Sequence, residues 1–182
     1  MRPTTSLIAV LCVVTIVMTI SLVFTDPAFA QTAPTTPAVT PTTYTDAVQG
    51  TEFSAGTIVG DTRLGASFAG EASGDLPGFL VSTTDYTPPS PGPNTTNKLV
   101  GGGWALFGER GTVFGSFTGG TVQWNADGTL AYIVADMSVL GGSVDGVPVT
   151  PGGVGTFAGV LDHRPLTQGL PPTVGGTLQL TF

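Results

Sequence analysis

The chain has 182 residues, only 9% of them charged, with a formal net charge of −7 and a pI near 4.2. Glycine is abundant, with 27 residues, and strong helix-forming residues are scarce, which excludes a helical bundle and disfavours an α/β fold. The chain lacks a stripe of basic residues that could neutralise phosphates, so we expect no nucleic-acid partner. The composition predicts a small all-β domain.

Residues 1–30 have the features of an export signal. Arg2 supplies one positive charge, residues 7–24 form an almost unbroken apolar run, and residues 28–30 (Ala-Phe-Ala) match the pattern after which a signal peptidase cuts. Cleavage would leave a chain that begins at Gln31 and is secreted, or located in the periplasm or cell envelope of a bacterium. The apolar run is also near the lower length limit of a membrane span, so an uncleaved anchor is the alternative.

Residues 31–50 are rich in threonine and proline, which predicts a disordered linker. From residue 51 to residue 182, short runs of valine, phenylalanine, leucine and threonine are separated by glycine and proline, as in an all-β domain. We expect strands over residues 51–59, 63–72, 77–86, 98–107, 111–118, 120–125, 129–140, 154–161 and 173–182. Loops are expected over residues 88–93, 141–153 and 164–172.

Two of these segments have clear local signals. Residues 122–124 and 130–132 are predicted to form a hairpin, because Asp127-Gly128 supplies the positive-φ position that a short reversal needs. The last strand alternates, with residues 178, 180 and 182 apolar and the residues between them polar. One face of that strand is therefore expected to be buried.

A short pattern, [Ser/Thr]-Phe-[Ala/Thr]-Gly, recurs at residues 67–70, 116–119 and 156–159. It predicts a strand with an inward phenylalanine, followed by a glycine that permits a bend or bulge. The unequal spacing of the three copies argues against a repeat architecture. Glycines within strands suit a small closed barrel, so we expect an antiparallel β-barrel of about eight strands, with a β-sandwich as the alternative.

Residues 152–159 read Gly-Gly-Val-Gly-Thr-Phe-Ala-Gly. This is similar to the Gly-Gly-Thr-Gly-x-Phe-x-Gly signature of the allene oxide cyclase and dirigent barrel superfamily, with Val154 in place of threonine. The resemblance implies an eight-stranded antiparallel barrel with an apolar interior, where some members guide cyclisation or radical coupling. It carries no catalytic residue over to this chain.

Candidate catalytic groups are few. His163 is the only histidine, and it could act as a general base, with Asp162 or another acid as its orienting partner. The alternative is a histidine at a strand end, since adjacent residues of a regular strand point to opposite faces and Asp162 would not face His163. The mature chain has no cysteine and this one histidine, too few for a zinc site. Calcium needs only oxygen ligands, for which Asp127 and Asp145 are candidates, but aspartates are common at turns for backbone reasons, so no metal is expected. No cofactor is expected either.

Candidate ligand-binding residues are aromatic. Trp104, Trp124 and Tyr132 could line a ligand cavity, although aromatic residues on strands more often belong to the core or to cross-strand pairs. We expect an exported, non-catalytic β-barrel that binds a small apolar ligand or a component of the cell envelope. The alternatives are a dirigent-like or cyclase-like enzyme that acts through an apolar cavity, and a small outer-membrane barrel. Membrane contact is expected only if the signal is uncleaved or the barrel is of the outer-membrane type.

Overall fold

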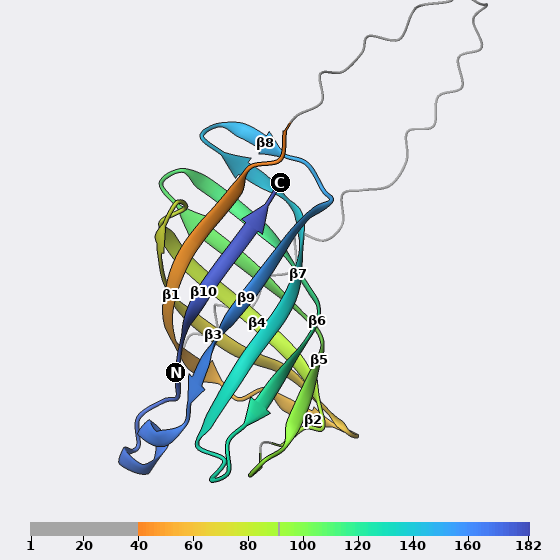
Figure 1. Ribbon diagram of the computed structural model, residues 1–182, viewed down its shortest axis with the longest axis vertical. Helices are drawn as coiled ribbons and strands as arrows, with labels where there is room; N and C mark the ends of the chain where they lie inside the picture. The colour runs from red at the N-terminus through yellow and green to blue at the C-terminus, as the bar shows by residue number, and fades with distance from the viewer. Residues whose placement is uncertain (1–39, 91) are drawn as a thin grey trace, which may run out of the picture. The chain divides into compact units, whose positions relative to one another are not determined.

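A computed structural model describes residues 40–90 and 92–182, which form an all-β domain (Figure 1). The strands are β1 (Thr43–Ser54), β2 (Thr57–Val59), β3 (Thr62–Gly74), β4 (Gly78–Thr87), β5 (Thr96–Gly108), β6 (Gly111–Trp124), β7 (Leu130–Val144), β8 (Val147–Val149), β9 (Gly153–Asp162) and β10 (Thr173–Thr181). A short 3₁₀-helix, η1 (Arg164–Gln168), connects β9 to β10. Within these ranges no helix is long and apolar enough to cross a membrane. The expected signal peptide and residues 31–39 of the expected linker lie outside the described residues.

Eight of the strands close into an antiparallel barrel. The neighbour order is β1-β10-β9-β7-β6-β5-β4-β3, and β1 completes the ring because it pairs with both β10 and β3. Thr43 lies opposite Thr181 in the first pairing, and Asp46 lies opposite Gly74 in the second. The short strands β2 and β8 pair with β3 and β7 and lie outside the ring. The predicted barrel is confirmed, and the chain does not form the alternative sandwich.

The expected boundary between linker and domain at residue 50 is wrong, because β1 begins at Thr43. Threonine and proline content suggested disorder in this segment. Threonine is β-branched, however, and suits the outer face of a strand, as at exposed Thr45. Asp46 and Val48 alternate into the interior, and pairing with two neighbouring strands supplies partners for the backbone of β1.

Two strand assignments and one loop also need correction. The segments 111–118 and 120–125, expected as separate strands, form the single strand β6, with a register shift between Phe117 and Gly119. The segment 51–59 is divided between the end of β1 and the short strand β2. Residues 141–153 were expected to be a loop, but β7 continues to Val144 and turns back into β8.

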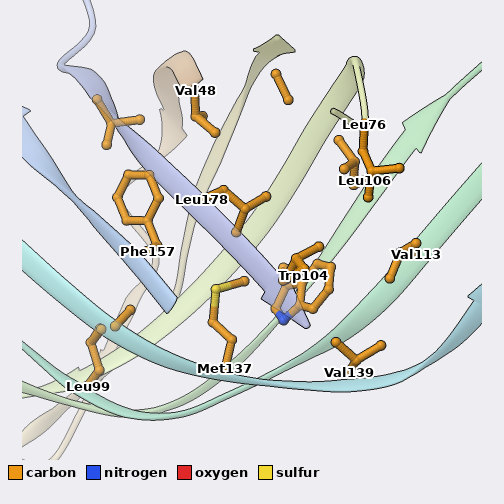
Figure 2. Packing of buried hydrophobic residues seen from close by; sticks show 14 of the residues in the cluster. Val48, Leu76, Leu99, Trp104, Leu106, Val113, Met137, Val139, Phe157 and Leu178 are labelled. Atoms are coloured by element: carbon orange, nitrogen blue, oxygen red, sulfur yellow. The ribbon is translucent and has the colours of Figure 1, made fainter. Parts of the chain in front are cut away.

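The predicted hairpin between β6 and β7 is confirmed. Trp124 pairs with Ala131, Gln123 pairs with Tyr132, and Gly128 has the expected positive φ of 71°. The alternation predicted for the last strand is also present, since Leu178 and Leu180 are buried while the residues between them face outward. Apolar side chains from the inner faces of the strands converge inside the barrel (Figure 2).

Glycine permits close strand contact where the barrel wall curves. A Cβ atom added to Gly70 would lie 2.2 Å from the carbonyl oxygen of Gln49 on the neighbouring strand, a separation that no real side chain tolerates. Gly50, also on β1, would meet the backbone of Ala69 in the same way, at 2.6 Å from its carbonyl oxygen. This pair of glycines therefore lets β1 and β3 approach closely where the ring closes.

The barrel has two unlike ends. At the end that carries β8, the turns after β3, β5 and β7 meet, and Arg110 joins them by donating hydrogen bonds to the Asp75 carbonyl and the Asp145 carboxylate. The interior there is filled by four buried residues, Leu76, Leu106, Val113 and Val144. They leave a space of only about 10 Å³. We call this the packed end. The other end carries η1 and the proline-rich connection from β4 to β5, and we call it the loop end (Figure 1).

Candidate functional site

The interior of the barrel holds a cavity of about 80 Å³. Every strand of the ring contributes to its wall, and the wall is mainly apolar, with side chains such as those of Val48, Leu99, Met137, Phe157 and Leu178 (Figure 2). A single ordered water needs only about 10–15 Å³. The cavity therefore has room for a small molecule among side chains that offer few hydrogen bonds.

The three phenylalanines of the recurring pattern all line this cavity. Phe68 lies on β3, Phe117 on β6 and Phe157 on β9, and each projects inward as the pattern predicted. The glycine after Phe117 lies at the register shift of β6, which agrees with the predicted bulge. The pattern therefore marks wall positions of one cavity, contributed by three strands that are separate in the chain.

Both tryptophans also line the cavity, as the sequence suggested for Trp104 and Trp124. Each is 4% exposed. The Nε1 atom of Trp124 donates a 2.7 Å hydrogen bond to Oδ1 of Asn97. The Nε1 atom of Trp104 is buried and has no partner among the described residues. A buried donor without a partner is uncommon in folded proteins.

Tyr132, the third aromatic candidate, does not belong to this site. It is 63% exposed and lies on the outer face of β7. Its neighbour Ala131 is buried on the inner face, opposite Leu161 of the paired strand. The prediction that Tyr132 lines the cavity is therefore wrong.

Asn97 organises the wall of the cavity near the loop end. It is fully buried, and besides accepting the Trp124 hydrogen bond it donates from Nδ2 to the carbonyl oxygens of Pro88 (2.6 Å) and Ser90 (3.3 Å). The proline-rich connection, which was correctly expected to lie outside the strands, lacks several backbone donors and is held here by a side chain instead. Asn97 thus links this loop to the cavity wall.

His163 lines the cavity at the loop end, whereas Asp162 does not. The carboxylate of Asp162 pairs with the guanidinium of Arg164, which holds the pKa of Asp162 below its usual value. The imidazole of His163 instead packs edge-on against the indole of Trp124, with ring centroids 4.7 Å apart. Asp162 is therefore not the orienting partner of His163, as strand alternation predicted for adjacent residues.

The acid that faces His163 is Glu52, which sequence reasoning did not identify. The His163 Nε2 atom lies 3.9 Å from Glu52 Oε2, and the two side chains are 20% and 13% exposed. Burial lowers the pKa of His163, partly offset by Asp162, and burial raises the pKa of Glu52, partly offset by Arg63. Each group is thus shifted toward its neutral form, and an imidazole that is neutral at pH 7 makes no ion pair with the carboxyl group.

Tyr86 is a further polar side chain that lines the cavity. Its pKa is raised, chiefly by burial, so its hydroxyl group remains protonated, and the Arg63 guanidinium lies 5.9 Å from the centre of its ring. Arg63 itself donates hydrogen bonds to the carbonyl oxygens of Pro89 and Ala55. We call Glu52, Tyr86, Asn97 and His163 the polar group of the cavity.

The described residues contain no cluster of three or more histidine, cysteine, aspartate or glutamate side chains that could hold a metal ion. The aspartates at turns have local partners: Asp127 accepts hydrogen bonds from Thr129, and Asp145 pairs with Arg110. The polar group contains one carboxyl group and one imidazole, which could bind or exchange protons with a bound molecule.

Comparison of the chain with protein-family models, with curated proteins and with solved structures finds no match. The cavity and the residues that line it are therefore the features of the chain that indicate a function.

Proposed function

We propose that this protein binds a small, mainly apolar molecule inside its barrel and does so without catalysis. The supporting observation is the interior cavity of about 80 Å³, whose wall combines the three motif phenylalanines with both tryptophans. Away from the polar group the wall offers few polar atoms, so a water molecule there would have fewer than the two to four partners that it normally needs. An apolar ligand would regain the dispersion contacts that an unfilled interior forgoes.

The loop end is the side from which we expect a ligand to enter. Buried leucines and valines fill the packed end, whereas the side chains of Glu52 and His163 at the loop end remain partly exposed. A component of the cell envelope with a small apolar group would fit the same cavity. An enzyme of the cyclase or dirigent type would use it too, with Glu52 and His163 as the groups that touch its substrate.

The outer-membrane alternative has less support. Barrels of that kind have a polar lumen and a continuous apolar outer band. Here the inner faces are apolar, and the outer faces mix polar residues, for example Thr45, Gln49 and Thr51 along β1, with exposed apolar ones such as Phe107 and Tyr132, so they form no continuous apolar band. We also propose that the protein is exported, and either secreted or held within the cell envelope, because residues 1–30 have the features of an export signal. N-terminal sequencing should find a mature chain that starts at Gln31, and a chain that starts at Met1 would contradict export with cleavage.

Ligand binding can be tested with intrinsic fluorescence, because the only two tryptophans of the chain both line the cavity. Titration of the purified protein with ethylbenzene should give a saturable change in tryptophan emission and a rise in melting temperature. Ala135→Leu, which adds a larger side chain inside the cavity, should raise the dissociation constant of ethylbenzene at least tenfold and reduce the rise in melting temperature. Ala158→Leu on the outer face of β9 is the matched control and should leave binding unchanged.

Saturable binding that is lost in Ala135→Leu and kept in Ala158→Leu would support the proposal. The proposal would be contradicted if both variants bound ethylbenzene equally well. It would also be contradicted if the wild type gave no saturable signal with either ethylbenzene or cyclohexane.

A further inference from the structure

We infer that the preferred ligand is an apolar molecule with one uncharged hydroxyl group, and that this hydroxyl group bridges Glu52 and His163. The inference rests on the proposed function and specifies the class of ligand that the cavity takes. It depends on the positions of these two side chains at the loop end of the cavity.

The geometry leaves a place for one bridging atom. The 3.9 Å between Nε2 of His163 and Oε2 of Glu52 is too long for a direct hydrogen bond. An oxygen atom about 2.8 Å from each of them would form the apex of a triangle over that separation, within the normal range of hydrogen-bond lengths. A ligand hydroxyl group could donate to the Glu52 carboxyl group and accept from His163.

Both side chains are available for such a contact. No described residue makes a hydrogen bond to the carboxyl group of Glu52 or to either ring nitrogen of His163, although both side chains are mostly buried. The Glu52 carboxyl group, whose side chain is 13% exposed, therefore has acceptor capacity that a ligand donor could use. The Asn97 amide and the Trp124 indole already bind to each other, whereas the Trp104 indole, which also lines the cavity, has no partner in the described part of the chain.

The charges at this end favour an uncharged polar group over a carboxylate. An anion would lie beside the Glu52 carboxyl group, in a chain whose formal net charge is −7. The nearest cation, Arg63, lies outside the cavity wall and already donates to the loop carbonyls of Pro89 and Ala55. A ligand carboxylate would therefore lie next to an acid and away from any cation of the cavity wall, whereas an uncharged hydroxyl group needs no ion pair.

Benzyl alcohol and ethylbenzene provide the test, because they have the same number of heavy atoms and differ by a hydroxyl group in place of a methyl group. The quantity to measure is the ratio of their dissociation constants, obtained by tryptophan fluorescence for the wild type and for each variant. Comparing this ratio between proteins removes the difference in hydration of the two free ligands. In Glu52→Leu and His163→Phe, the ratio should shift about tenfold against benzyl alcohol.

Glu71→Leu is the matched control, since Glu71 lies exposed on the outer face of β3, and its ratio should equal that of the wild type. Glu52→Gln keeps a hydrogen-bonding side chain and should retain most of the preference. If Glu52→Leu does not fold, His163→Phe provides the test. Binding of ethylbenzene shows that a variant is folded and that its cavity is intact.

The outcomes separate the two proposals. A ratio that stays within twofold of the wild-type value in both Glu52→Leu and His163→Phe, while ethylbenzene still binds, would overturn the bridging hydroxyl and leave the binding function standing. Failure of the wild type to bind either molecule would overturn the proposed function itself. Benzoate that binds more tightly than benzyl alcohol would also overturn the inference.

Discussion

Replacing Asn97 by alanine should destabilise the barrel strongly, because this one side chain satisfies a buried donor and holds a loop. The variant would leave Nε1 of Trp124 without a partner in a buried position, since the native acceptor is Oδ1 of Asn97 at 2.7 Å. An unsatisfied buried donor costs about 1–3 kcal/mol. The carbonyl oxygens of Pro88 and Ser90 would lose a protein donor, but these residues are exposed and can bind water.

The removed side-chain atoms also leave a void, because Asn97 is fully buried. Together these effects predict a loss of about 2–4 kcal/mol in the free energy of unfolding. Urea denaturation followed by tryptophan fluorescence measures this quantity. Gln123→Ala is the control, because Gln123 adjoins Trp124 on the same strand but faces solvent, and it should cost less than about 0.5 kcal/mol.

A second variant separates the two roles of the side chain. Asn97→Asp keeps an acceptor for Trp124 but replaces the donor to Pro88 by a carboxylate oxygen, so at neutral pH it should also be destabilised. If Asn97→Ala were as stable as Gln123→Ala, the reasoning about the buried amide would be refuted.

Two further predictions concern the barrel wall and its one fully buried acid. Gly70→Ala should lower the free energy of unfolding by about 1–3 kcal/mol in urea denaturation, because its Cβ would meet the Gln49 carbonyl. Gly103→Ala, whose Cβ would have its nearest contact at 3.6 Å, should be nearly neutral. Equal effects of the two substitutions would contradict the close approach of the strands at Gly70. Burial raises the pKa of Asp46, whose Oδ1 accepts from the Leu76 amide, so the folded state holds the proton more tightly and loses stability as pH rises from 3.8 through the raised pKa. Asp46→Asn keeps that acceptor, so its free energy of unfolding should rise relative to that of the wild type between pH 3.5 and 7. A difference in free energy of unfolding that stays constant over this pH range would refute this reading.

The fold could be predicted largely from the sequence because its signals are local. Alternation in the last strand, the Asp127-Gly128 reversal and the inward phenylalanine of each recurring pattern all depend on neighbouring residues. The start of the barrel was predicted wrongly, because threonine-rich composition is common to linkers and to exposed strand faces. The pairing of β1 with β10 makes this segment a strand, and β10 lies at the opposite end of the chain.

The candidate site was predicted only in part. Both tryptophans and His163 line the cavity, but Tyr132 does not, because it lies on the outward face of β7. Ala135 and Met137 face inward there, while Tyr132 and Val134 are exposed. Apolar residues occupy both faces of this strand, so hydrophobicity alone does not decide which face is buried. Glu52 was missed because its partner, His163, comes from a strand end far along the chain, and no local pattern indicates that they meet.

The central claim is that the barrel encloses an apolar cavity that a small molecule can occupy. A crystal structure of the protein under xenon pressure tests it most directly, because xenon enters dry apolar cavities and scatters strongly. The account predicts xenon inside the barrel, between Phe68, Met137 and Phe157. An interior filled by repacked side chains or by a hydrogen-bonded cluster of waters, without xenon, would contradict it.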